Sequence, residues 1–251
     1  MKPKLAVLAV GSFLILASCD AFFSTNLFKE AGLGQVKLPS ASELATMSTD
    51  ELLSEADSPE FYVQLEADSG KLTAVIGNLS GQMGSSDPAT AQEAAFLYAQ
   101  IQLKTTDAFE AVNGIFDAFA TVDLAAVDGS NIDDLLRAAL PAGVLEDRTR
   151  FDAAIAALLV ADSAYGSLGT SIGSDGLQGD IPVGDLGTAA QGALVAAVIA
   201  NLQYSGDLED NLWLAVQNQP SSITGVDTVT INSDTSLSNL LGAVGITFTF
   251  N

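Results

Sequence analysis

Hydrophobic residues recur at helical spacing over most of the chain, from about residue 40 to residue 218. Helix-start signals precede several of these stretches. Residues 40–43 and 48–51 fit the capping box, in which a serine hydroxyl accepts from a free backbone amide and a glutamate reaches back to the cap. Pro59 and Pro88 each follow a capping residue, and proline is well tolerated at the first helical position. The pattern predicts a mainly α-helical protein.

The strongest periodic stretch lies between residues 88 and 121. Its apolar stripe consists of Ala94, Leu97, Ile101, Ala108, Val112, Ile115 and Phe119. A run of this length exceeds the usual globular helix of about 8 to 20 residues. We therefore expect a break near residues 104–107 that gives two antiparallel helices, with a single long helix as the alternative.

Shorter periodic stretches lie on both sides of this one. The stretch that begins at Pro59 has its apolar positions at Phe61, Leu65, Leu72, Ile76 and Leu79. Further helices are expected at 131–140, stopped by Pro141, at 146–165, from Thr188 to about residue 202, and at 207–218 around Trp213. The helix at 146–165 is expected to bury Phe151, Ile155, Leu158, Leu159 and Tyr165.

Glycine dominates residues 166–187, "GSLGTSIGSDGLQGDIPVGDLG", which hold seven glycines and one proline. This composition disfavours a helix. We expect a loop over residues 166–187. A connection of this length inside a compact domain is uncommon and is often functional or mobile.

The C-terminal residues change to a period of two. Residues 227–232 and 245–251 alternate β-branched or aromatic residues with others, as strands do, and residues 235–243 predict a short helix between them. The expected fold is therefore mainly α: a bundle or array of antiparallel helix pairs with a small two-stranded β element near the C-terminus. Such an element is stable only by packing on the helices.

One window of the helical region has small residues at helix-pair positions. It places Tyr98 and Ala99 in a first helix, Asp107 at a turn, and Ala111, Ile115 and Ala118 in a second helix. Over residues 95–123 this resembles the tetratricopeptide repeat family. The chain departs from that family at Gln102, where an aromatic is usual, and at Asp123, where proline is usual. A plain helical bundle is the other interpretation.

The first 19 residues have the layout of a secretory signal, with Lys2 and Lys4 before an apolar run at 5–15. That run is shorter than the roughly 20 apolar residues of a transmembrane helix. The next residues, Leu16, Ala17, Ser18 and Cys19, resemble the lipobox of bacterial lipoproteins, and Cys19 is the only cysteine. The resemblance implies cleavage before Cys19 and acylation of its thiol. A small buried thiol in a core is the alternative.

These predictions divide the chain into a signal peptide at 1–18, a lipidated tether at 19–39 and a single mainly helical domain at 40–251. Each buried methylene contributes about 0.8 kcal/mol, so two or three acyl chains on Cys19 would hold the protein on a membrane. The expected location is the cell membrane or the outer membrane. The helical domain would face the periplasm or the exterior.

Charge limits the classes of partner. The chain has 9 basic and 31 acidic residues and a net charge of −22, which becomes about −24 once Lys2 and Lys4 leave with the signal. Phosphate backbones bind clustered Lys and Arg, and the nearest approach to such a cluster is Arg148 with Arg150. We therefore expect no nucleic acid partner. The dispersed acidic residues indicate a solvated surface.

Candidate catalytic and metal-binding patterns are few. Residues 169–173 fit G-x-S-x-G, but the nucleophile elbow needs a histidine and the chain has none. The absence of histidine also removes a common zinc ligand. Oxygen ligands for calcium exist in two acidic sets, neither in EF-hand order. These sets are Asp123, Asp128, Asp133 and Asp134, and Asp175, Asp180 and Asp185. We expect no enzymatic activity, no cofactor and no metal site.

The leading functional hypothesis is a membrane-anchored envelope lipoprotein that binds or assembles with another envelope protein and catalyses nothing. The first alternative is a small-ligand receptor or an accessory component of an uptake system. Its pocket would be lined by Trp213, Tyr204 or Tyr165, with residues 166–187 at the mouth. The second alternative is a calcium-stabilised surface adhesion protein.

Overall fold

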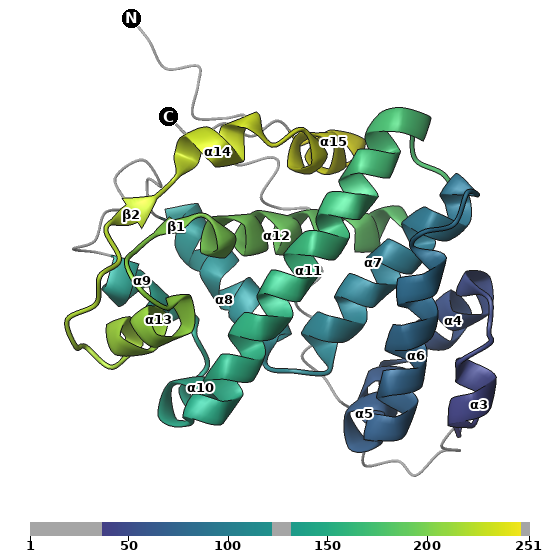
Figure 1. The fold of residues 1–251 in the computed structure, drawn as a ribbon, viewed down its shortest axis with the longest axis horizontal. Helices are drawn as coiled ribbons and strands as arrows, with labels where there is room; N and C mark the ends of the chain where they lie inside the picture. The colour runs from purple at the N-terminus through teal and green to yellow at the C-terminus, as the bar shows by residue number, and fades with distance from the viewer. Residues whose placement is uncertain (1–36, 122–131, 247–251) are drawn as a thin grey trace, which may run out of the picture. The chain divides into compact units, whose positions relative to one another are not determined.

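The computed structural model describes residues 37–121 and 132–246. Over these residues the chain is mainly helical with one small antiparallel sheet, which confirms the predicted fold class (Figure 1). The elements in chain order are α3 (Ala41–Leu44), α4 (Thr49–Ala56), α5 (Pro59–Ala67), α6 (Ser69–Gln82), α7 (Pro88–Lys104), α8 (Ala108–Thr121), α9 (Ile132–Ala139), α10 (Ala142–Glu146), α11 (Arg148–Asp175), α12 (Val183–Ala200), β1 (Leu202–Gln203), α13 (Leu208–Val216), β2 (Gly225–Val226), α14 (Thr228–Ser233) and α15 (Thr235–Ala243).

The predicted helix starts at α3, α4, α5 and α7 are confirmed. Both capping boxes form, with Ser40 paired to Glu43 and Ser48 paired to Glu51. Asp87 caps α7 by accepting from the amide of Thr90. The periodic stretch after Pro59 is interrupted once, because Asp68 ends α5 and accepts from the first free amides of α6.

The expected break in the long stretch at 88–121 is also confirmed. Helix α7 ends at Lys104, where the hydroxyls of Thr105 and Thr106 donate to carbonyls of its last turn. Helix α8 then begins at Ala108. Asp107, in the turn, forms a two-point ion pair with Arg150 of α11. The two threonines stabilise the end of α7 locally, and the ion pair joins the turn to a distant helix.

Helix α11 occupies the middle of the fold (Figure 1). It packs most extensively against α7, and next against α15 and α12. Its buried residues include Phe151, Ile155, Leu158, Tyr165, Leu168 and Ile172, while Leu159 is partly buried. These residues form one continuous apolar core with the buried faces of α7 and α12.

The prediction of a loop at 166–187 is wrong for most of these residues. Helix α11 continues to Asp175 and α12 begins at Val183, so only residues 176–182 are a loop. Gly169 and Gly173 lie where α15 crosses α11, and a Cβ at either position would overlap Ser236 or Asn239 of α15. The burial gained from this close crossing outweighs the weak helix propensity of glycine, about 1 kcal/mol per residue.

The helix start predicted at Thr188 is also wrong, because the helix begins five residues earlier, at Val183. Thr188 lies inside α12, and its hydroxyl donates to the carbonyl of Gly184 one turn earlier (3.5 Å). The apolar residues predicted for this helix are buried as expected: Leu194, Val195, Val198, Ile199 and, just after it, Leu202. The helices expected at 131–140, 207–218 and 235–243 correspond to α9, α13 and α15.

The small β element exists, but it is formed by other residues than predicted. Leu202 pairs with Val226 and Gln203 with Gly225. Residues 228–232 of the predicted strand at 227–232 lie in α14 instead, because Asp227 caps the amide of Thr230 and Ile231 is buried in the core. The second predicted strand, 245–251, lies mostly outside the described residues, which end at 246.

Two helices, α11 and α12, have the length and apolar composition of membrane-spanning segments. About half of the most apolar window of each is already buried in the protein, 50% in α11 and 61% in α12. Core helices of a globular domain have the same composition. The buried face of α11 packs mainly on α7, α15 and α12, and that of α12 mainly on α11, α8 and α15.

Candidate functional site

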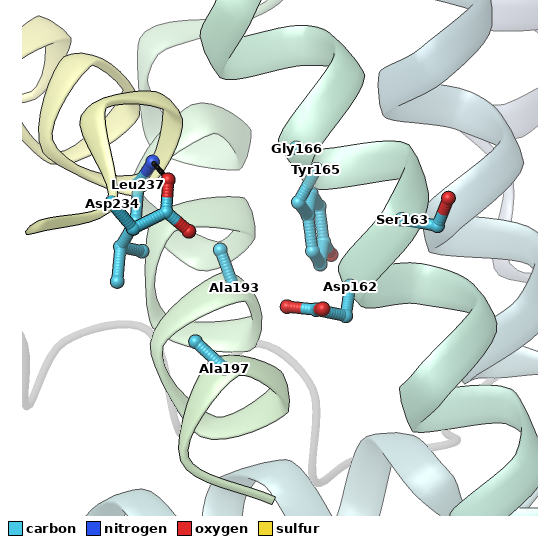
Figure 2. Close-up of a pocket in the computed structure, with 8 residues that line it drawn as sticks. All are labelled: Asp162, Ser163, Tyr165, Gly166, Ala193, Ala197, Asp234 and Leu237. Atoms are coloured by element: carbon cyan, nitrogen blue, oxygen red, sulfur yellow. Dashed lines mark hydrogen bonds between the residues drawn. The ribbon is translucent and has the colours of Figure 1, made fainter. Parts of the chain in front are cut away.

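A small cavity lies between α11, α12 and α15 (Figure 2). Its volume is about 160 Å³. The residues that line it include Asp162, Tyr165, Ala193, Ala197, Asp234 and Leu237. Pockets for drug-sized ligands usually enclose about 300–1,000 Å³, so this cavity is below the size of a typical ligand pocket.

Two carboxylates give the cavity its electrostatic character. Figure 2 shows the side chains of Asp162, from α11, and Asp234, at the start of α15, on opposite sides of the cavity. Burial, followed by the charge on Asp234, raises the pKa of Asp162 to about 6. Asp234 has a structural role, because its Oδ1 accepts from the amides of Ser236 and Leu237 (2.9 and 3.1 Å) and caps α15.

Tyr165 closes the inner side of the cavity. Its ring is 2% exposed, and Gln100 of α7 donates to its hydroxyl at 3.5 Å. Burial raises the pKa of this phenol, so it stays neutral. Helix α12 approaches the ring at Gly192, where a Cβ would lie 3.0 Å from the phenol oxygen. Tyr165 is thus a core residue at the junction of three helices.

A second polar cluster fixes the short loop between α11 and α12. Gln92 of α7 is fully buried, and its Nε2 donates to the Ser171 hydroxyl (3.1 Å) and the Gly176 carbonyl (2.9 Å). Its Oε1 accepts from the amide of Gln178 (2.8 Å). One side chain therefore satisfies three groups of the segment 171–178.

Glu93 extends this cluster towards α4. Its Oε1 accepts from the amide of Asp180 and its Oε2 from the hydroxyl of Thr49, both at 2.9 Å. Glu93 is 2% exposed, and burial, with Asp50 acting in the same direction, raises its pKa. The two hydrogen bonds favour the ionised form and oppose that rise. The buried carboxyl joins α7, α4 and the loop.

Two cationic side chains lie against aromatic rings. The ammonium of Lys104 is 4.5 Å from the ring centre of Tyr62 and 5.7 Å from that of Phe109, and burial lowers its pKa. The guanidinium of Arg148 lies 5.6 Å from the ring of Trp213. These contacts join separate helices, which is a structural role for both cations.

The residues predicted for lipid attachment, Leu16, Ala17, Ser18 and Cys19, lie outside the described residues. Ser171, in the G-x-S-x-G match, lies inside α11 and accepts from Gln92, so no strand-to-helix elbow surrounds it. Over the described residues, no group of three or more acidic or sulfur ligands is arranged to hold a metal ion. Asp123 and Asp128 of one calcium set fall in the gap at 122–131.

The three aromatic residues suggested for a ligand pocket lie in different environments. Only Tyr165 lines the cavity. Trp213 packs edge-on against Phe151, with 5.2 Å between ring centres, and Tyr204 is 39% exposed. The described residues therefore do not bring these rings together.

Sequence reasoning missed the polar residues that the structure places at the centre of the fold. Asp162 interrupts the apolar run "AALLVADSAY", and Gln92 and Glu93 lie on the apolar helix α7. A charged residue within an apolar helical stretch was the available signal, because such residues are rarely buried unless they have a partner. The identity of each partner depended on tertiary packing.

Comparison with known protein families, curated proteins and solved structures finds no match to this chain.

Proposed function

We propose that this protein is a membrane-anchored envelope lipoprotein that acts as a non-enzymatic binding or assembly partner for another envelope protein. The observation that carries the proposal is the N-terminal sequence, in which Leu16, Ala17 and Ser18 lead to the only cysteine. Acyl chains on Cys19 would keep the helical body near a membrane.

The structure of the helical domain is consistent with binding a partner through its outer surface and not through an internal pocket. The side chains of its helices pack into a continuous core, and the cavity at Asp162 is smaller than the usual pocket for a drug-sized ligand. A small-ligand receptor would need a larger space lined by several of the aromatic residues considered above. The acidic surface indicates a partner that tolerates or complements negative charge.

The anchor is tested by mass spectrometry of the N-terminus and by membrane fractionation. The intact protein is expected to begin at Cys19, carry acyl groups and sediment with membranes. Cys19→Ala is expected to keep its leader and lose acylation, whereas Ser18→Ala, which retains a small residue before the cysteine, is expected to behave as the unaltered protein. An intact leader or an unmodified thiol on the unaltered protein contradicts the proposal.

The binding role is tested by photo-cross-linking from exposed positions in living cells. Val183 is 73% exposed and Val229 is 76% exposed, and they lie on different elements, α12 and α14. A photoreactive residue at one of them is expected to give a discrete cross-linked protein that disappears in the Cys19→Ala background. Failure to obtain a discrete product from positions spread over the whole surface counts against an assembly role.

A further inference from the structure

Helix α15 is attached to the rest of the fold through a close contact with α11. Gly169 and Gly173 allow its backbone and Asn239 to approach, and Asn239 Nδ2 donates to the Gly169 carbonyl at 3.1 Å. Leu237, Leu240 and Leu241 are buried in the same interface. The contact is therefore close, and its buried side chains are leucines, with the Asn239 hydrogen bond as a polar contact within the helix and two acidic groups at its N-terminal end.

At that end, two acidic side chains share the small cavity. Asp162 comes from α11 and Asp234 from the start of α15 (Figure 2). Helix α12 contributes Ala193 and Ala197, which carry no charge. The other titratable group lining the cavity is the neutral phenol of Tyr165 on α11, and no Lys or Arg is among the lining residues. Two carboxylates thus face each other across the contact without a cation between them.

The two carboxylates are not equivalent. Oδ1 of Asp234 accepts hydrogen bonds from the amides of Ser236 and Leu237 and from the Ser236 hydroxyl, at 2.9, 3.1 and 2.7 Å. These bonds cap the first turn of α15. Asp162 has no such capping role, and burial disfavours its charged form. Asp162 is therefore the group that we expect to take up a proton as the pH falls.

We propose that acid strengthens the docking of α15 on α11 and α12: protonation of Asp162 removes its repulsion from Asp234 and the need to bury its charge, so the C-terminal helix is held more tightly. The device is independent of the proposed lipid anchor.

The direction and the pH window follow from proton linkage. The pKa of Asp162 is about 6 in the folded chain, and a solvated aspartate has a pKa of about 3.9. A carboxyl whose pKa is raised by docking stabilises the docked state below that pKa. The stabilisation is complete below about pH 4 and is lost as the pH rises through 6. At about pH 5 the equilibrium constant for undocking is expected to be about tenfold smaller than at about pH 8.

Hydrogen–deuterium exchange on the full chain measures this difference. After correction for intrinsic exchange rates, amides of α15 are expected to gain about tenfold protection between about pH 8 and about pH 5. Amides of α7 serve as the internal reference. An equal gain of protection in α7 would show that protonation changes the global stability, and this would overturn the proposal. Unchanged protection of α15 would also overturn it.

Three variants separate Asp162 from other acidic residues. Asp162→Asn is expected to show high α15 protection at both pH values. Asp175→Asn removes the same charge from the exposed end of the same helix and is expected to keep the tenfold response. Asp234→Asn keeps a capping side chain and is expected to move the response to lower pH. A full response in Asp162→Asn would overturn the proposal.

A measurement on the unaltered chain does not depend on any variant folding. The carboxyl carbon-13 shift of Asp162 is expected to titrate with a midpoint near 6. A midpoint near 4, the value of a solvated aspartate, would overturn the proposal.

Discussion

Single buried polar side chains hold distant parts of this chain together. Gln92 is the clearest case, because one amide group bonds to Ser171, Gly176 and Gln178 and is fully buried. A buried hydrogen bond has a modest net contribution, but its loss leaves the partner groups without hydrogen bonds away from water. The end of α11 and the loop after it depend on this residue.

Gln92→Ala is accordingly expected to lower the free energy of unfolding by about 2 to 4 kcal/mol, from three lost hydrogen bonds and a cavity. Equilibrium unfolding in urea measures the change. Gln178→Ala is the matched control, since its side chain is exposed and its amide donates to the Asp175 carbonyl, and a change within about 0.5 kcal/mol is expected there. Equal effects of the two substitutions would show that burial of Gln92 is unimportant.

Local chemistry at residue scale was predictable where the partner is near in sequence. The pairs Ser40 with Glu43 and Ser48 with Glu51 were visible because a capping box spans only four residues. Asp162 and Asp234 are 72 positions apart, and nothing in either local sequence indicates the other. Their meeting depends on how α15 crosses α11, which is a property of packing.

At the scale of elements, glycine was the source of the largest error. Seven glycines in residues 166–187 indicated a loop, whereas helix α11 runs through Gly166, Gly169 and Gly173. The composition of a segment indicates how much glycine weakens a helix. It does not indicate that a second helix, here α15, packs so closely that a side chain at Gly169 or Gly173 would overlap it. The alternation in residues 227–232 predicted a strand, and this was also wrong. Capping by Asp227 and burial of Ile231 stabilise a helix there instead.

Gly169 and Gly166 provide a direct test of this explanation. A Cβ at Gly169 would overlap the Ser236 backbone, so Gly169→Ala is expected to lower the free energy of unfolding by about 2 kcal/mol or more. Gly166 lies in the same helix with open space around it, so Gly166→Ala is expected to stabilise by about 0.5–1 kcal/mol. Thermal and urea unfolding of both variants measure the two signs, and a stabilising Gly169→Ala would refute the close crossing.

At the scale of the whole molecule, charge opposes folding. The chain carries a net charge of −22, and the ion pairs found among the described residues involve only Arg137, Arg148 and Arg150 as cations. Self-repulsion of this kind destabilises the compact state. Hydrophobic burial in the core has to exceed it.

Salt is therefore expected to stabilise the protein. Raising sodium chloride from about 0.01 M to about 0.2 M shortens the screening length from about 30 Å to below 10 Å. The melting temperature is expected to rise by a few degrees, measured by circular dichroism at neutral pH. Potassium chloride at the same ionic strength should give the same rise, because screening does not depend on the ion. A fall in melting temperature would show that attractive surface pairs dominate.

The pairing of α7 with α11 also has a consequence for the speed of folding. These two helices form the most extensive contact in the described residues, yet α7 ends at Lys104 and α11 begins at Arg148. Forming this contact closes the intervening residues into a large loop. The chain entropy lost in closing that loop is offset only after the two helices have packed. A ribosome-bound chain that lacks α11 can pack α7 on α4 and α6 but is missing the largest partner of α7, so completion of the core must wait until most of the polypeptide has been synthesised.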